Sequence, residues 1–342
     1  MTMRSELGES PDLLEQLLEA AAPQVAAVVA AMREREIDVV VVAARGTSDH
    51  AALYGQYILG ARNHLLVAPA APSLVSIYGA APRLRRALVI GISQSGRSPD
   101  VVAVVAQARR QQALTVAITN EPDSELAVAA DHLIGLRAGA ERAVAATKTY
   151  LAEIAVLAML STALGGDDQG AAELRALPVA LREALAEEDR VAALAESWAA
   201  ETRCIVLGRG FHYATAREWA LKLKELAYVL ADPYSGADFQ HGPIALIQAG
   251  FPVLAVATTG PALEGMTTLL ARVRDADARL IVASDVAMLR DLGEGISLPS
   301  VPEWLSPLVA IIPAQLFAYH LARAKGLDTE APRNISKVTL TR

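Results

Sequence analysis

The chain has 342 residues, a net charge of −7 and a pI near 5.5. This length suits two domains of ordinary size. Apolar residues make up 53% and aromatic residues only 4%, so alanine, valine and leucine must fill the core. The acidic balance disfavours a nucleic-acid surface, which needs clustered lysine and arginine.

The cysteine count and the hydropathy pattern bear on the cellular location of the protein. The single cysteine, Cys204, excludes an internal disulfide framework and is typical of a reducing compartment. The first residues lack the basic, apolar and small-residue pattern of a signal peptide. The longest apolar segments contain Glu153, Gln315 or His320, which disfavours a membrane span. We therefore expect a cytoplasmic protein that binds neither nucleic acid nor membrane.

The predicted elements alternate between strands and helices. Residues 1–36 predict two helices, after Pro11 and after Pro23, and residues 147–200 predict long helices with a break at 164–171. Apolar runs of strand length occupy residues 37–44, 87–93, 114–119, 131–136, 203–208, 252–258, 279–284 and 295–299. Near-continuous apolar strands that alternate with helices indicate parallel sheets covered on both faces.

The strand pattern repeats along the chain. Gly46 and Gly210 are 210 − 46 = 164 residues apart, and Gly96 and Gly260 are 260 − 96 = 164 residues apart. This offset superimposes four strands, so we predict an α/β protein with two doubly wound parallel-sheet subdomains. The predicted parts are an N-terminal helical segment, two subdomains and an extended tail: 1–36, 37–195, 196–325 and 326–342.

Two loops follow predicted strands and carry small polar side chains. In the second loop, Ser98 lies at an N-cap position and Pro99 opens a helix. A helix N-terminus favours an anion, and Gly96 lets the backbone approach a ligand closely. Hydroxyl or amide donors for a phosphate are Ser93, Gln94, Ser95 and Ser98, while Thr47 and Ser48 precede a helix that we expect to begin near Asp49. An ordinary capped turn explains the loop equally well.

The nucleotide motifs are missing from these loops. Neither the P-loop pattern nor the G-x-G-x-x-G pattern occurs in the sequence. A single phosphate on a small molecule therefore fits better than a nucleoside triphosphate. No histidine or cysteine has metal-ligand spacing, so we expect neither a metal site nor a cofactor.

A second polar group lies in the other half of the chain. Glu218, Lys222 and Glu225 are spaced i, i+4 and i+7, which places them on one helical face and Lys224 on another. A solvated face with ion pairs is the alternative, although the rest of that helix is apolar. His241 follows in a glycine–proline turn, where polar residues are often functional, but a structural histidine is the default interpretation.

Seven motifs in order resemble one family from about residue 37 onward. They are GTS (46–48), SQSGRSPD (93–100), AATKTY (145–150), LGRG (207–210), ALKLKE (220–225), QHGP (240–243) and PRNISK (332–337). The chain resembles the sugar isomerase (SIS) family, specifically the isomerase half of glutamine–fructose-6-phosphate aminotransferases. Its first residues also resemble those of stand-alone type II glucosamine-6-phosphate deaminases. The resemblance implies two SIS subdomains.

The resemblance also implies roles for individual residues. Glu225 matches the base that moves a proton between C1 and C2 of the open-chain sugar, and Lys222 supports it. His241 matches a residue that assists ring opening from a neighbouring subunit, which implies a homodimer with shared active sites. Lys337 matches a lysine that forms a Schiff base with the keto sugar. The implied phosphate and sugar contacts are Ser93, Gln94, Ser95 and Ser98, with Thr47, Ser48, Val144 and Ala146 lining the same pocket.

Three departures from the family pattern affect the choice of sugar. Ala146 replaces a serine, Ser98 replaces a threonine, and Arg45 replaces a small residue, so we expect a reshaped or more cationic pocket mouth.

The hypothesis is an isomerase and deaminase that converts an amino sugar phosphate, such as glucosamine 6-phosphate, to fructose 6-phosphate and ammonia. It rests on the expectation that no glutaminase half is present. The alternatives are a fructosamine-6-phosphate deglycase, an isomerase or deaminase of N-substituted amino sugar phosphates, and a non-catalytic sugar phosphate sensor. The sensor is disfavoured because Glu225, His241 and Lys337 are all present.

Overall fold

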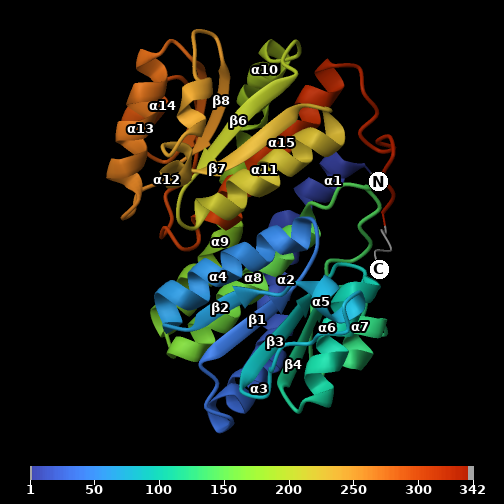
Figure 1. Ribbon diagram of the computed structural model, residues 1–342. Helices are drawn as coiled ribbons and strands as arrows, with labels where there is room; N and C mark the ends of the chain where they lie inside the picture. Colours follow the sequence, from blue (N-terminus) through green and yellow to red (C-terminus); the bar gives the residue numbers. More distant parts are fainter. Residues whose placement is uncertain (1, 338–342) are drawn as a thin grey trace. The chain divides into compact units, whose positions relative to one another are not determined.

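The structure is a computed structural model that describes residues 2–337 (Figure 1). The described chain forms two compact units, and each unit contains its own sheet. Unit 1 comprises residues 2–11, 142–147 and 176–335, and unit 2 comprises residues 12–141, 148–175 and 336–337. The two units are described separately below.

The sheet of unit 2 has five parallel strands in the order β2-β1-β3-β4-β5. Val39 of β1 pairs with Ala87 of β3, and the register continues to Ala43 opposite Gly91. The strands are β1 (Val39–Ala43), β2 (Leu66–Pro69), β3 (Ala87–Ile92), β4 (Leu114–Thr119) and β5 (His132–Gly135).

Helices surround the sheet of unit 2. They are α2 (Ser10–Ala20), α3 (Ala22–Glu34), α4 (Thr47–Asn63), α5 (Pro72–Ser76), α6 (Pro99–Arg110), α7 (Glu125–Ala129), α8 (Lys148–Gly165) and α9 (Asp168–Ala186), of which α2 and α9 extend across the boundary. Val89 and Ala117 of the sheet pack against Val101 and Val105 of α6 and Leu126 of α7. One helix, α8, is long and apolar enough to span a membrane, but it is 83% buried, as expected of a core helix.

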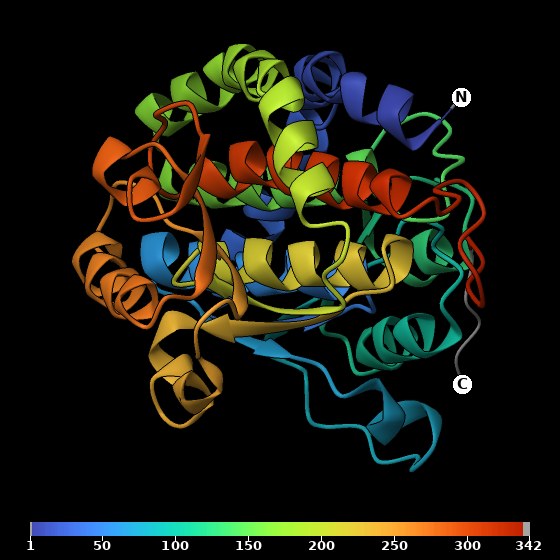
Figure 2. The same ribbon diagram turned by 90° about the horizontal axis from the view of Figure 1, so that it is seen from above.

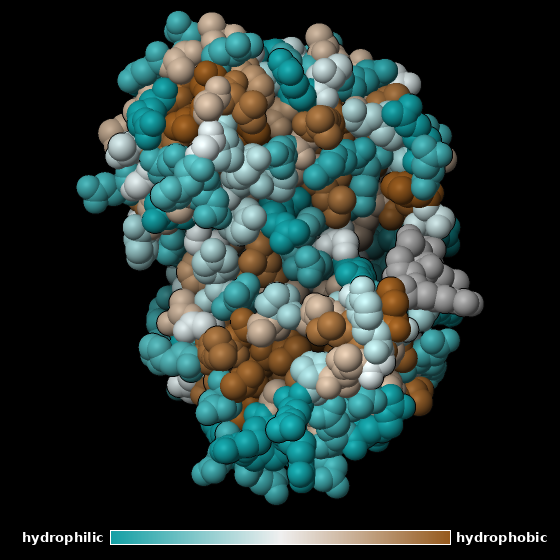
Figure 3. Space-filling model, in the orientation of Figure 1, coloured by the Kyte–Doolittle hydropathy of each residue, from teal (hydrophilic) through white to brown (hydrophobic). Residues whose placement is uncertain are grey.

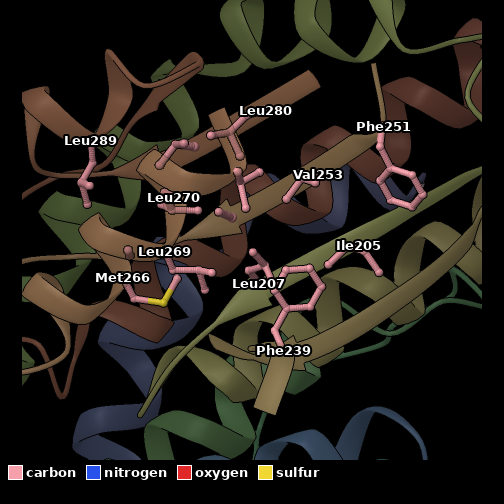
Figure 4. Packing of buried hydrophobic residues seen from close by; sticks show 14 residues of the cluster. Ile205, Leu207, Phe239, Phe251, Val253, Met266, Leu269, Leu270, Leu280 and Leu289 are labelled. Atoms are coloured by element: carbon pink, nitrogen blue, oxygen red, sulfur yellow. The ribbon is translucent and has the colours of Figure 1, made fainter. Parts of the chain in front are cut away.

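The sheet of unit 1 repeats the topology of the first sheet. Its five parallel strands have the order β10-β9-β8-β6-β7. They are β6 (Arg203–Gly208), β7 (Leu230–Ser235), β8 (Pro252–Val256), β9 (Arg279–Ser284) and β10 (Glu294–Ser297). Figure 4 shows one face of this sheet, where Leu207 and Val253 pack with Phe239, Met266 and Leu270. The strand residues of this cluster lie two positions apart, such as Ile205 and Leu207, because successive side chains of a strand point to opposite faces of the sheet.

The helices of unit 1 are α1 (Met3–Gly8), α10 (Glu188–Ser197), α11 (His212–Leu226), α12 (Gly236–Phe239), the 3-10 helix η1 (Pro243–Leu246), α13 (Leu263–Asp275), α14 (Ala287–Arg290) and α15 (Ser306–Ala324). Helices α11 and α15 pack against each other (Figure 2, gold and red). The Phe317 ring meets Trp198 and Trp219 edge-on, with ring centroids 5.8 and 5.7 Å away. These contacts fix the helix that carries the predicted base.

The predicted fold class is confirmed, and so is each predicted strand. The sequence did not reveal β2 and β7, which are themselves related by 230 − 66 = 164 residues. The gap-free offset is wrong at the last two strand pairs, because β4 and β9 begin 279 − 114 = 165 residues apart and β5 and β10 begin 294 − 132 = 162 residues apart. The connections before these strands therefore differ in length, while the strand order is the same. The predicted domain boundaries stay a prediction.

The drawn surface is mostly hydrophilic, with separate apolar patches (Figure 3). Unit 2 exposes several large apolar side chains in and near β2 and α5: Leu66, Leu74, Ile77 and Tyr78.

Candidate functional site

The strand order of unit 2 reverses between β1 and β3. In open parallel sheets, ligands bind beyond the carboxyl ends of the strands at this point. The loops after β1 and β3 contain residues 44–46 and 93–98. The fold thus brings the two predicted polar loops to the same edge of one sheet.

The loop after β3, residues 93–98, has a fixed backbone. The Gln94 carbonyl accepts hydrogen bonds from the Asn120 N–H at 3.1 Å and the Thr119 hydroxyl at 3.2 Å. Gly96 has a φ of +63°, and a Cβ there would lie 2.0 Å from the Ser124 Oγ. Only glycine fits this position, because both the conformation and the available space exclude a side chain.

The side chains of this loop differ in exposure, since Ser93 is buried whereas Gln94, Ser95 and Ser98 are half-buried. Ser98 is the N-cap residue of α6, as predicted, but its side chain makes no capping hydrogen bond. Its hydroxyl instead lies 3.4 Å from the Ser93 hydroxyl, and the Ser95 hydroxyl accepts the Arg97 N–H at 3.4 Å. The Gln94 amide forms no hydrogen bond among residues 2–337. The loop therefore offers three hydroxyls and an amide beside a helix N-terminus.

The loop after β1 differs from its expected form. Helix α4 begins at Thr47 rather than Asp49, because Gly46 takes the N-cap position with a φ of +56°. Thr47 is half-buried. The Ser48 hydroxyl is buried and donates to Glu153 Oε1 at 2.7 Å. Ser48 thus contacts the core helix α8.

Arg45 joins the two loops. Its guanidinium lies 2.7 Å through Nε and 2.6 Å through Nη2 from Asp100 Oδ2, in the first turn of α6. Asp100 is only 1% exposed, so a buried carboxylate balances the added charge. Arg45 therefore does not add an unpaired positive charge, as a more cationic pocket mouth would require. Its ion pair with Asp100 instead links the loop after β1 to the start of α6.

Lys337 also belongs to unit 2. Its Nζ lies 2.7 Å from Glu141 Oε2, and the Glu141 side chain is fully buried. Glu141 also accepts hydrogen bonds from the N–H and the hydroxyl of Thr149, at 3.1 and 2.8 Å. The sequence reasoning missed Glu141, because a single glutamate in a loop has no periodic pattern. The amine and the polar loop therefore lie in the same compact unit.

Val144 and Ala146 belong to unit 1, in a short connecting segment. Both are half-buried and alternate with the buried Ala145 and Thr147, so one side of the segment faces outward. The buried Glu6 of α1 accepts the Arg142 N–H at 2.6 Å and holds the start of the segment. Nothing in the sequence signals this contact.

The predicted polar face of α11 is buried. Glu218 and Lys222 have fully buried side chains, and the Glu225 side chain is 23% exposed. The Lys222 Nζ lies 2.6 Å from Glu225 Oε2 and 3.3 Å from Glu218 Oε1. Burial alone would lower the pKa of Lys222, but the two carboxylates outweigh it and raise the pKa. The alternative of a solvated face is wrong, because Lys222 is buried between two carboxylates that raise its pKa.

Glu225 lines an open pocket of about 450 Å³ at the C-terminal end of α11. The tail closes one side of it, since the Arg333 guanidinium stacks 4.0 Å above the Tyr228 ring and the Arg333 N–H donates to the Tyr228 hydroxyl at 2.9 Å. The lining includes Lys224 and Asn334. A carboxylate fixed by a buried lysine and open on its other side can exchange a proton with a ligand.

His241 is exposed in the turn between α12 and η1. Its side chain forms no hydrogen bond or ion pair with the other described residues of this chain. The structural interpretation of His241 as a core histidine is therefore wrong.

The equivalent strand ends of unit 1 are closed. His212 is buried, with its Nε2 at 2.9 Å from the Thr258 hydroxyl and 2.8 Å from the Ser306 hydroxyl. A Cβ at Gly260 would lie 2.3 Å from Glu303 Cδ, and the Glu303 carboxylate accepts the Ala262 N–H before α13. The Glu303 side chain thus packs against Gly260, the residue that corresponds in the repeat to Gly96 of unit 2. Among residues 2–337, no cluster of histidine, cysteine or acidic residues could hold a metal.

The chain matches the SIS domain family over residues 35–163 and 198–324, and it belongs to this family. It is 37% identical over 308 residues to the glutamine–fructose-6-phosphate aminotransferase (isomerizing) of Methanothermobacter thermautotrophicus, covering 88% of this chain and 51% of the relative. The chain thus spans about half the length of the curated relatives it matches.

Two solved structures resemble the whole chain. A protein of Silicibacter pomeroyi DSS-3, provisionally described as a phosphosugar isomerase, is 34% identical with a TM-score of 0.86, covering 96% of this chain and 100% of its own. The C-terminal domain of the glucosamine–fructose-6-phosphate aminotransferase of Francisella tularensis is 26% identical with a TM-score of 0.88, covering 96% and 97%. These similarities confirm the predicted family and its two-subdomain fold.

Proposed function

We propose that the chain is a phosphosugar isomerase that acts on an amino sugar 6-phosphate and releases ammonia. The observation that carries this proposal is Glu225, a partly exposed carboxylate that lines a pocket and is fixed by the buried Lys222. Similarity to aminotransferases with isomerizing activity and to a phosphosugar isomerase supports the same reaction class.

The phosphate binds the loop of residues 93–98. The hydroxyls of Ser93, Ser95 and Ser98 and the amide of Gln94 donate to phosphate oxygens, and the N-terminus of α6 favours the negative charge. The closed strand ends of unit 1, where the Glu303 side chain packs against Gly260, support a single phosphate site per chain.

The sugar ring opens before any proton moves between carbons. Histidine can supply this step because its ordinary pKa lies near neutrality. The exposure of His241 leaves it free to reach a neighbouring subunit, so we propose a homodimer in which each subunit completes the other's site.

The central step is a proton transfer within the open-chain amino sugar. Glu225 removes the proton from C2 and returns it to C1, while a proton of the 2-amino group passes to O1, which turns the 2-amino aldose into the 2-imino ketose. Lys337 attacks C2 of the imine, ammonia leaves, and a Schiff base between Lys337 and the keto sugar remains. Water hydrolyses this Schiff base to fructose 6-phosphate and restores the lysine.

The single thiol of the chain bears on the source of ammonia. Its one thiol, Cys204, is buried, and burial raises its pKa to about 12. No cysteine in these 342 residues is therefore suited to release ammonia from glutamine. We propose that these residues act on ammonia-containing sugars and not on glutamine, in the cytoplasm, where a buried free thiol is typical.

A panel of substrates tests the proposal. The purified chain is supplied with glucosamine 6-phosphate, N-acetylglucosamine 6-phosphate or a fructosamine 6-phosphate, and ammonia and fructose 6-phosphate are measured by coupled assays. We expect both products from glucosamine 6-phosphate. Turnover of the fructosamine phosphate alone favours a deglycase, for which the small Ala146 leaves room beside the sugar. Phosphosugar binding without turnover across the panel contradicts the proposal and favours a sensor.

A further inference from the structure

Glu141 is a buried carboxylate to which the sequence analysis assigned no role. It lies in unit 2, just before α8, and its side chain is fully buried. The N–H and hydroxyl of Thr149, in the first turn of α8, hold it at 3.1 and 2.8 Å. The N-terminal end of a helix stabilises a negative charge. Glu141 is therefore held in place as a carboxylate.

The partner of this carboxylate is the lysine amine that the proposed function makes a nucleophile. Lys337 Nζ lies 2.7 Å from Glu141 Oε2, and the Lys337 side chain is 24% exposed. One side of the amine thus meets a buried anion, while the chain leaves it partly accessible to a small molecule. An ammonium cannot attack a carbonyl carbon, because its lone pair holds a proton.

We propose that Glu141 positions Lys337 and accepts its proton, so that the amine can attack C2 of the sugar. This inference deepens the proposed function and rests on the Schiff-base role of Lys337. The step is written here for the keto sugar, as the reverse of the final hydrolysis. The ammonium gives one proton to Glu141, the nitrogen forms a bond to C2, and the carbonyl π bond breaks. The second proton of the nitrogen moves to the former carbonyl oxygen, which yields a carbinolamine.

The same carboxyl group then returns the proton during dehydration of the carbinolamine. The carbinolamine hydroxyl leaves as water and takes the proton that Glu141 holds, while the nitrogen lone pair forms the protonated Schiff base. The carboxylate is restored, and the positive charge is now on the iminium nitrogen. The proton and charge balance closes without another reactant. A fixed carboxylate 2.7 Å from the amine suits this exchange.

Borohydride trapping with fructose 6-phosphate measures the step directly. In the wild-type chain we expect a reduced sugar adduct on Lys337, located by peptide mapping. In Glu141→Gln we expect the trapping rate to fall at least tenfold, with the affinity for fructose 6-phosphate unchanged. Glu121→Gln, which changes an exposed glutamate of the same unit, should trap at the wild-type rate.

Two further variants separate proton transfer from a structural role. Glu141→Ala with added formate should regain trapping, because formate replaces the carboxylate, whereas chloride should not restore it. Glu141→Asp should keep partial activity. If Glu141→Gln does not fold, the trapping rate of Glu141→Asp is compared with that of the wild type instead. A kcat loss without a change in KM is expected in both carboxamide and aspartate variants.

The outcomes distinguish this inference from the proposed function. If the wild-type chain gives no adduct on Lys337, the Schiff base itself is wrong and the role of Glu141 is wrong with it. If the wild type is trapped and Glu141→Gln is trapped at the same rate, the Schiff base stands and the role of Glu141 is overturned. Failure of formate to restore Glu141→Ala likewise contradicts proton exchange.

Discussion

Lys222 lies between two carboxylates of its own helix, 2.6 Å from Glu225 Oε2 and 3.3 Å from Glu218 Oε1. The pair with Glu218 is fully buried, whereas Glu225 reaches the pocket surface. One lysine thus fixes a carboxylate that is partly open to a ligand. We propose that this arrangement serves proton transfer, because the hydrophobic packing of α11 alone does not require it.

Glu225→Gln should abolish the proton transfer. We expect kcat to fall by about 10²- to 10⁴-fold, because a general base contributes an acceleration of that order. Phosphosugar affinity, measured by calorimetry, should stay within about twofold because the phosphate loop lies in unit 2. The control Glu264→Gln changes an exposed glutamate of the same unit and should retain activity. Full activity in Glu225→Gln would exclude the role.

Lys222→Met should destabilise the protein by roughly 3–5 kcal/mol, since it leaves the buried Glu218 without its ammonium. Lys224→Met, on an exposed position of the same helix, should cost far less. The measurement is the free energy of unfolding in urea at pH 7. Equal losses in the two variants would show that the buried pair contributes little.

The same lysine predicts a pH dependence. The folded pKa of Lys222 is raised above its ordinary value of 10.5, so its stabilisation is complete below that value. It should be lost as the pH rises through the raised folded pKa. The difference in unfolding free energy between wild type and Lys222→Met should therefore stay constant from pH 7 to 9 and shrink in stronger alkali.

More of the backbone fold than of the candidate site could be predicted from the sequence. The long apolar strands and the repeat could be predicted from local pattern. Strands β2 and β7 could not, because each contains a proline in place of a continuous apolar run, Pro69 or Pro233. The spacing of Glu218, Lys222 and Glu225 predicted a shared face but not its burial, which the packing of α15 on α11 determines. Glu141 meets Lys337 from 196 positions away in sequence, and no local pattern encodes such a contact.

Gly96→Ala should damage the phosphate loop. The new Cβ would lie 2.0 Å from Ser124 Oγ at a φ of +63°. Gly139 of the same unit has a φ of +64° with nothing within 4 Å of its Cβ position. Gly139→Ala should therefore cost only the left-handed strain of about 1–2 kcal/mol. We expect Gly96→Ala to cost more and to lose phosphosugar binding, as measured by thermal melting and calorimetry.

Ser95→Ala should weaken binding of the sugar phosphate. A hydrogen bond to a charged group contributes about 1.5–3 kcal/mol, which corresponds to a loss of affinity of roughly 10- to 100-fold. Ser76→Ala, at an exposed position of the same unit, is the control. Titration with fructose 6-phosphate measures both, and unchanged affinity in Ser95→Ala would remove the loop from the binding site.

His212 should make the protein sensitive to acid. Burial lowers its folded pKa to about 3 from an ordinary 6.5, so the unfolded chain binds the proton first. The contribution is complete above pH 6.5 and is lost as the pH falls toward 3. Between pH 7 and pH 5 we expect His212 to cost the wild type about 2 kcal/mol of unfolding free energy.

His212→Gln removes this titrating group, so its urea stability should change less between the two pH values. His241→Gln, which changes an exposed histidine of the same unit, should retain the wild-type slope. An unaltered slope in His212→Gln would mean that other groups dominate the acid response.

The central claim is that Glu225 moves a proton between adjacent carbons of a phosphosugar. The most direct measurement is proton NMR of fructose 6-phosphate incubated with the chain in D₂O. Wild type should exchange one C1 hydrogen for deuterium, and Glu225→Gln should not, although both bind the sugar. Absence of exchange in the wild type with bound fructose 6-phosphate, or equal exchange in both proteins, would contradict this account.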